Sequence, residues 1–211
     1  MSWKIREAAI NKYKSLYLDV IGNYEKFDKF LEMYLKRIKS FSFEASHLVM
    51  FTNACLFYAV PSPTTIDILA KTFQTCLLKD SATRFIDFAA GKGVFSWLLH
   101  REIPTNQIVA VDIQEFEKTF WPIQKHITFQ PSDILFLAWS HPNNALEIQK
   151  EIDHYIDIGG KCVIILGQFG GDLTYPCPKC FVDNEEWDVT SYSAETCLFE
   201  NSDTLTINIR K

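Results

Sequence analysis

The sequence predicts an α/β domain built on a mostly parallel sheet with helices on both faces, preceded by a helical N-terminal cap. Three observations carry this prediction. Residues 5–57 hold apolar positions at helical spacing, residues 84–101 read as a strand that turns through small residues into a helix, and short apolar runs then alternate with helical segments as far as residue 209. Repeated strand–helix units imply parallel strands joined by crossovers that cover both faces.

The helical cap is the first of these elements. Its apolar positions recur every three to four residues and are clearest at Phe27, Phe30, Leu31, Tyr34, Leu35 and Ile38. Gly22 and the stretch 40–42 interrupt the pattern, which predicts two or three helices before Pro61. We therefore divide the chain into a helical cap, residues 1–60, and an α/β domain, residues 61–211.

The α/β domain begins with a capped helix. A proline at a helix start with a preceding Ser or Thr side chain favours a helix over 64–78. Two further helices are expected at 94–101 and 144–158. Strands are expected at 84–88, 108–112, 126–129, 134–139, 161–167, 187–192 and 204–209. Only residues 130–133 separate the third strand from the fourth, so no helix is expected between those two.

Composition excludes several classes of protein. Hydrophobic residues make up 47% of the 211 residues and charged residues 22%, as in an ordinary globular chain. No apolar run reaches the roughly 18 residues of a membrane span, and the first residues lack the apolar core of a signal peptide. We expect a cytoplasmic protein that does not enter membranes.

Charge is unevenly distributed and gives a weak indication of partners. Residues 1–60 carry nine Lys and Arg against six Asp and Glu, whereas residues 61–211 carry twelve against twenty. No dense basic cluster of the kind typical of strong nucleic-acid binding is present. A nucleic acid stays open as a partner, and the helical cap is a candidate surface for a protein partner. The aromatic stripe in residues 13–41 is expected to pack on the α/β domain, with a substrate-gripping role as the secondary interpretation.

The turn after the first α/β strand carries the most chemical information. Asp87 ends an apolar run and is followed by Ala89, Ala90, Gly91 and Gly93, after which a helix begins. Small residues let a ligand approach the backbone closely. A dinucleotide turn has three glycines, whereas here the sixth position counted from Gly91 is a serine. The pattern resembles the first motif of class I S-adenosylmethionine-dependent methyltransferases, which have a Rossmann-like fold.

This resemblance implies a set of cofactor contacts. Asp87 would anchor the methionine end of S-adenosylmethionine through its environment, with Ala89, Ala90, Gly91 and Gly93 as the turn. Asp112 ends the next strand nineteen residues after Gly93, where such enzymes place a carboxylate that accepts hydrogen bonds from both ribose hydroxyls. Ile113 would border the adenine. Asp133 is a candidate to receive the adenine amino group, and a turn cap is the alternative.

Two loops are candidates for binding the methyl acceptor. Trp139, Ser140 and His141 follow the fourth strand, where many such enzymes position the nucleophile, but the family's Asn-Pro-Pro-Tyr type motif is not matched. His141 is the one weak candidate for a catalytic base, with a plain loop residue as the alternative. Trp139 would be core or pocket wall. Gln168 opens a glycine-containing loop at the end of the fifth strand, the edge where open α/β sheets bind ligands.

The pair Cys177 and Cys180 has a metal-binding spacing. Structural zinc needs four ligands, and no second Cys or His pair stands at matching spacing, so we predict no metal site. The remaining hypothesis is an S-adenosylmethionine-dependent methyltransferase whose acceptor the sequence does not identify. Its rivals are a catalytically inactive scaffolding protein of the same fold and, disfavoured by the two-glycine turn, a nicotinamide-dependent oxidoreductase.

Overall fold

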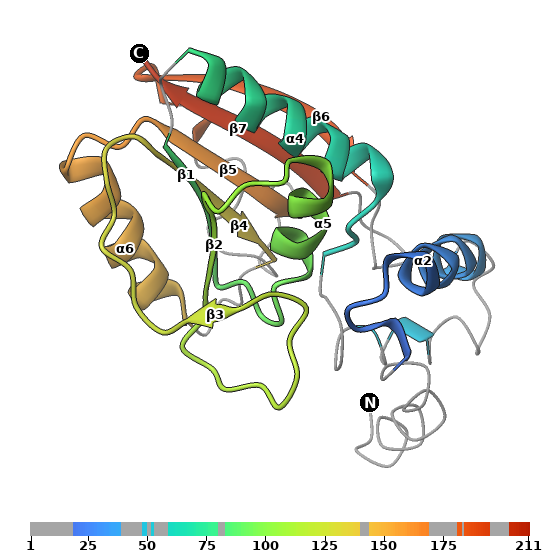
Figure 1. Ribbon diagram of the computed structural model, residues 1–211. Helices are drawn as coiled ribbons and strands as arrows, with labels where there is room; N and C mark the ends of the chain where they lie inside the picture. Colours follow the sequence, from blue (N-terminus) through green and yellow to red (C-terminus); the bar gives the residue numbers. More distant parts are fainter. Residues whose placement is uncertain are drawn as a thin grey trace.

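The chain forms a seven-stranded sheet with the order β3-β2-β1-β4-β5-β7-β6 (Figure 1). The computed structural model describes residues 19–38, 48–49, 52, 59–79, 83–139, 144–168, 181–182, 184–194 and 203–211. Its strands are β1 (Arg84–Phe88), β2 (Ile108–Val111), β3 (Ile123–Gln124), β4 (Asp133–Ala138), β5 (Cys162–Gln168), β6 (Trp187–Ala194) and β7 (Asp203–Arg210). Strands β1 to β5 are parallel, and β7 runs antiparallel between β5 and β6. The expected α/β architecture is confirmed.

The helices lie on both faces of this sheet. Helices α4 (Pro63–Leu78) and α5 (Val94–Glu102) lie over one face, and α6 (Ala145–Asp157) lies on the opposite side (Figure 1). Successive strand residues point to opposite faces. Phe85, Phe136 and Ile164 therefore pack with α4 and α5, whereas the neighbouring residues Ile86, Leu135 and Val163 pack with α6. The continuous apolar runs of the sequence are explained by a sheet that is buried on both faces.

Helix α4 begins as its sequence predicts. Pro63 is its first residue, and the Ser62 hydroxyl accepts a hydrogen bond from the Thr65 backbone N–H at 3.2 Å. The proline has no N–H to leave unpaired, and the Ser62 hydroxyl satisfies a backbone N–H that has no partner within the helix.

None of the helices described is both long enough and apolar enough to cross a bilayer.

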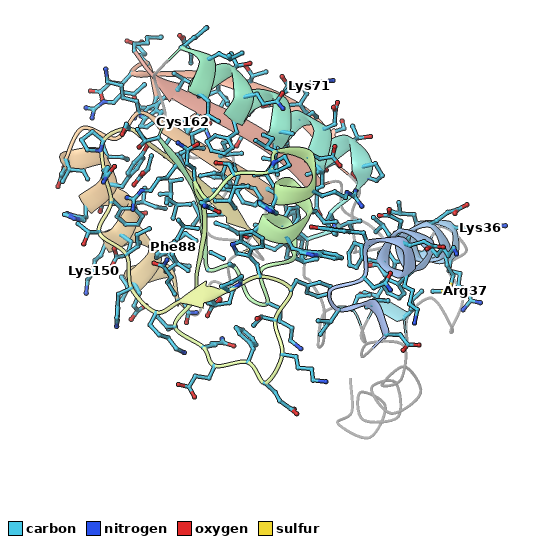
Figure 2. The ribbon with its side chains drawn as sticks, viewed as in Figure 1. Lys36, Arg37, Lys71, Phe88, Lys150 and Cys162 are labelled. Atoms are coloured by element: carbon cyan, nitrogen blue, oxygen red, sulfur yellow. The ribbon has the colours of Figure 1, made fainter. Side chains whose placement is uncertain are left out.

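The cap includes helix α2 (Tyr24–Ile38), which packs on α5. Its predicted stripe is buried except for Leu35, which is half-buried. The Tyr24 ring stacks on Trp97 of α5 with centroids 4.1 Å apart, and its hydroxyl donates to the Trp97 carbonyl at 3.1 Å. Lys36 and Arg37 project from the other side of α2, away from the sheet (Figure 2). The division of the chain at residue 60 stays a prediction.

The third strand is not where the sequence pattern indicated. β3 covers only Ile123–Gln124, paired with Ala110 and Val111 of β2, and residues 126–130 form no ladder. The apolar pattern at residues 126–130 arises because Phe129 is buried against the rings of Tyr155 and Phe88. Figure 2 labels Phe88 in this part of the core. Residues 112–132 are all described and contain no helix, as expected for the short link between the third and fourth strands.

Candidate functional site

The turn between β1 and α5 has a left-handed backbone that an L-residue adopts only with strain. Ala89, Gly91 and Gly93 adopt positive φ angles of 57°, 57° and 72°. The turn is closed by hydrogen bonds from Ala90 N–H to the Val111 carbonyl at 3.0 Å and from Gly93 N–H to the Ala90 carbonyl at 2.9 Å. This left-handed conformation costs an L-residue about 1–2 kcal/mol, so Gly91 and Gly93 adopt it freely, whereas Ala89 bears that cost.

Gly91 and Gly93 have different roles, which the sequence alone does not distinguish. A Cβ added to Gly93 would lie 2.9 Å from Trp121 Cβ and 3.0 Å from Ile123 Cδ1, so this glycine is required for packing inside the protein. A Cβ added to Gly91 would meet no atom within 4 Å. Gly91 therefore is the glycine whose missing side chain leaves space for a ligand.

Asp112 follows β2 and faces this turn. Its Oδ2 accepts the Gly91 N–H at 2.8 Å, and its Oδ1 accepts the Gln114 N–H at 2.8 Å. A carboxylate has about four lone-pair positions, so each oxygen can accept one more donor. The side chain is half-buried, and the neighbouring Ile113 is 71% exposed. The Lys125 ammonium donates to the Ile113 and Gln114 carbonyls at 3.0 and 2.8 Å and so holds this loop in place.

Asp87 lies beneath the turn and is only 2% exposed. Its Oδ2 accepts the Ser96 hydroxyl at 2.8 Å and the Ser96 backbone N–H at 3.3 Å. Gly93, the residue before α5, has no side chain to cap the helix, and Asp87 satisfies one of its free N–H groups instead. Burial raises the pKa of Asp87 to about 7, hydrogen bonds from Ser96 oppose that rise, and the negative Asp112 adds to it.

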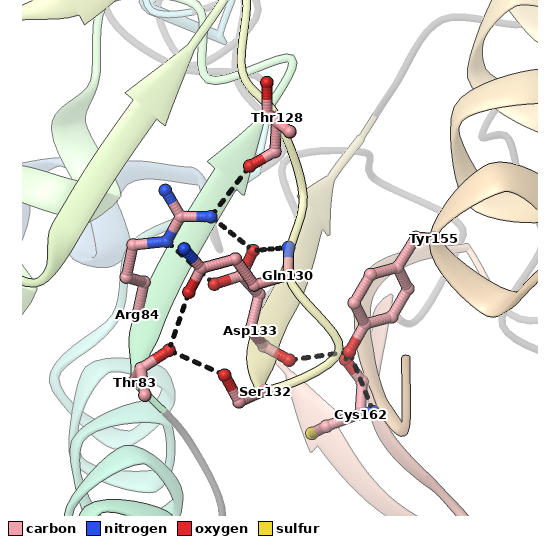
Figure 3. Close-up of polar contacts among 8 residues, drawn as sticks. All are labelled: Thr83, Arg84, Thr128, Gln130, Ser132, Asp133, Tyr155 and Cys162. Carbon is pink, nitrogen blue, oxygen red and sulfur yellow. Dashed lines mark hydrogen bonds and ion pairs between the residues drawn. The ribbon is translucent and has the colours of Figure 1, made fainter. Parts of the chain in front are cut away.

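Asp133 lies at the amino ends of the parallel strands, whereas the glycine turn lies at their carboxyl ends. It is the first residue of β4, level with Arg84, the first residue of β1 (Figure 3). Its carboxylate accepts from Arg84 at 2.8 and 2.7 Å and from the Gln130 backbone N–H at 2.7 Å, while Tyr155 donates to its carbonyl at 2.6 Å. We therefore remove Asp133 from the candidate site, because its position and contacts are those of the turn cap considered as the alternative.

The ends of β4, β5 and β7 form a second group at the same edge as the glycine turn. Trp139 follows β4 with a positive φ of 50°, and its backbone N–H donates to the Leu166 carbonyl at 2.9 Å. Its indole Nε1 donates to Asp203 Oδ2 at 2.9 Å. Gln168, the last residue of β5, stands opposite Asp203 in the ladder. Trp139 and Gln168 are thus brought together, whereas Ser140 and His141 lie outside the described residues.

Asp203 was not predicted from the sequence. It is the first residue of a strand, which in a parallel sheet would put it at the far edge. Because β7 is antiparallel, Asp203 instead lies at the carboxyl end of β5, the end of the sheet that also carries the glycine turn. Among the residues described, no three or more His, Cys, Asp or Glu side chains gather as a metal site would require. Cys177 and Cys180 lie outside those residues.

Solved structures share this fold. Comparison with protein-family models and with curated proteins gives no match. An O-methyltransferase from Bacillus cereus in complex with SAH matches with a TM-score of 0.50 and 11% identity, over 85% of this chain and 96% of that chain. Cofactor-bound Rv0187 from MTB matches with a TM-score of 0.52 and 11% identity, over 85% and 95%. At this identity the likeness shows the fold.

Proposed function

We propose that this chain, which has the Rossmann-like fold of class I S-adenosylmethionine-dependent methyltransferases, binds S-adenosylmethionine and transfers its methyl group. The observation that carries the proposal is the pairing of an open turn with an oriented carboxylate. Gly91 leaves space where a side chain would otherwise stand, and its own N–H fixes the Asp112 carboxylate beside that space. The fold of the solved methyltransferases supports the same assignment.

The residues present fit this cofactor. Asp112 retains a free acceptor position on each oxygen, which suits two adjacent ribose hydroxyls, and the exposed Ile113 offers an apolar surface for the adenine. Asp87 gives the methionine end a negative environment once it loses its proton. When bound, S-adenosylmethionine supplies an activated methyl group on a positively charged sulfur. The protein then has to align the acceptor with that methyl and exclude water.

The acceptor would bind farther along the same edge, near Trp139 and Gln168, between the cap and the loops that follow β4 and β5. Ser140 and His141 belong to this proposed region by their place in the sequence. A protein partner at the cap stays a prediction, and a nucleic acid stays open as a partner.

Titration calorimetry with S-adenosylhomocysteine tests the proposal. Wild-type protein should bind it, and Asp112→Ala should lower the affinity at least about 100-fold, because two charge-assisted hydrogen bonds are lost. Glu115→Ala is the matched control, since Glu115 is in the same loop with 91% of its side chain exposed. No heat with wild-type protein at millimolar ligand would favour the scaffolding alternative, for which the absence of helices over residues 112–132 is the supporting feature. Binding of NAD instead would favour the oxidoreductase.

A further inference from the structure

Asp203 is a buried acid at the ligand edge of the sheet that the cofactor site does not use. We define the acceptor corner as Trp139, Gln168 and Asp203, which stand at the ends of β4 and β5 and at the start of β7. In the sheet order, β2 carries Asp112 and β1 carries the glycine turn, followed by β4, β5 and β7. A cofactor anchored by its ribose at β2 and lying on the turn after β1 has its methyl-bearing end on the side of β4.

The distances suit an acceptor lying between the turn and Asp203. Neighbouring strands are about 4.8 Å apart, so β7 lies about 14 Å from β1 across the sheet. Asp87 and Asp203 point to the same face, because Asp87 contacts Ser96 of α5 and Asp203 alternates with Leu205 and Ile207, which pack with α4 and α5. The acceptor corner is therefore on the correct face and at the correct edge to approach a methyl donor held at the turn.

One carboxylate oxygen of Asp203 has no hydrogen-bond donor among the described residues. The residue has no exposed surface, and its Oδ2 is occupied by the Trp139 indole N–H. Its Oδ1 is buried and has no hydrogen-bond partner among the described residues. No ion pair in the described part of the chain includes Asp203. A buried carboxyl oxygen without a donor costs free energy, and such atoms call for an explanation. Burial raises the pKa of Asp203 to about 7, while the Trp139 hydrogen bond opposes the rise.

We propose that Asp203 is a catalytic residue whose Oδ1 accepts the proton of a hydroxyl-bearing, uncharged methyl acceptor. This inference rests on the proposed methyltransferase function. An uncharged hydroxyl brings its own proton, so the buried carboxylate becomes neutral during the reaction without a second buried charge. Trp139 holds the carboxylate by Oδ2 and directs Oδ1 toward the acceptor, which makes Trp139 a positioning residue.

The step balances. The acceptor oxygen forms a bond to the methyl carbon while the carbon–sulfur bond breaks, and the electron pair of that bond stays on sulfur. The acceptor O–H bond also breaks, its pair stays on oxygen, and the proton moves to Asp203 Oδ1. The products are a methyl ether, the neutral thioether S-adenosylhomocysteine and a protonated Asp203. A base of pKa near 7 is well matched to such a transfer at neutral pH.

The test uses the full chain saturated with S-adenosylhomocysteine, with phenol as the hydroxyl probe. The assigned carboxyl carbon signal of Asp203 is recorded by NMR during a phenol titration and during a matched titration with anisole, which has no proton to donate. We expect phenol to shift the Asp203 signal in a saturable way and anisole to leave it in place. This measurement needs no variant to fold. A phenol titration that leaves the signal unmoved would overturn the proposal.

Methyl transfer from S-adenosylmethionine to phenol provides the kinetic readout. Asp203→Asn keeps the shape and an oxygen for the Trp139 indole, but it cannot take up a proton at neutral pH. We expect its kcat to fall about 10²–10⁴-fold with little change in KM, and the acid limb near pH 7 to disappear. Asp188→Asn, an exposed acid on β6, is the control that should retain wild-type activity. An Asp203→Asn variant as active as wild type would refute the role.

Calorimetry on the same samples separates the two claims. Asp203→Asn should bind S-adenosylhomocysteine as wild type does, because Asp203 is three strands from the glycine turn. If wild-type protein fails to bind S-adenosylhomocysteine, the proposed function itself is wrong. If wild-type protein binds it, but phenol does not shift the Asp203 signal and Asp203→Asn retains wild-type activity, only the catalytic assignment is wrong.

Discussion

Replacing Asp87 with Asn should stabilise the protein at pH 8 and reduce the pH dependence of its folding. The buried carboxyl has a pKa of about 7 in the folded protein, against 3.8 in an exposed one. The folded protein therefore keeps this proton to higher pH than the unfolded chain does. The stabilisation from protonated Asp87 is complete below about pH 4 and is lost as the pH rises through about 7.

The magnitude follows from the same pKa values. A rise from 3.8 to about 7 corresponds to roughly 4 kcal/mol of destabilisation at pH 8, since one pKa unit is about 1.4 kcal/mol. Asn removes this charge and still offers an oxygen to the Ser96 hydroxyl and N–H. Asp203, whose pKa burial raises in the same direction, accounts for a second part of the slope. Asp87→Asn alone should flatten the pH dependence by about half.

Urea unfolding followed by tryptophan fluorescence at pH 5, 6, 7 and 8 measures this effect. Asp67→Asn is the control, because Asp67 is an exposed partner of Lys71 on α4, and its loss should change stability by less than about 0.5 kcal/mol at every pH. An Asp87→Asn variant that is less stable than wild type at pH 8, or equally sensitive to pH, would show that burial does not raise the pKa of Asp87 and would refute the reasoning.

Three further changes should have distinct signatures. Gly93→Ala should lower the free energy of unfolding by about 2–4 kcal/mol in urea, because its Cβ would contact Trp121 at 2.9 Å and the backbone would be strained. Gly91→Ala should cost only about 1–2 kcal/mol in folding, yet calorimetry should show S-adenosylhomocysteine affinity reduced at least about 10-fold; unchanged affinity would mean that the ligand lies elsewhere. Arg84→Met should destabilise by about 2–4 kcal/mol, since it leaves the buried Asp133 carboxylate without its cation, while ligand affinity stays at the wild-type value.

The sequence predicts the central elements well because their burial is uniform. The strand 84–88 is found with exactly these limits, and helices α4, α5 and α6 differ from prediction by one residue at most at each end. These segments are either continuously apolar or periodic, so pattern and structure agree. The predicted strand at residues 126–129 is wrong for a physical reason. The apolar pattern of this segment arises because Phe129 packs into the core, and not because the segment pairs with a neighbouring strand.

The candidate site could be predicted where its residues follow the carboxyl ends of parallel strands. Gly91 and Asp112 are 21 residues apart in the sequence, but each follows one of the adjacent parallel strands β1 and β2, and their expected proximity is confirmed by the Gly91–Asp112 hydrogen bond. The adenine assignment of Asp133 is wrong because Asp133 begins β4 and so lies at the amino ends of the parallel strands, whereas the glycine turn follows their carboxyl ends. Asp203 could not be found, because its position depends on the direction of β7, which no local pattern encodes.

The antiparallel insertion of β7 also has an evolutionary consequence. The proposed cofactor half of this edge derives from one continuous stretch, residues 84–114, whereas the proposed acceptor corner combines Trp139, Gln168 and Asp203 from three separate strand ends. Under the proposed function, a lineage changes the acceptor by altering residues at these strand ends and inherits residues 84–114 unchanged.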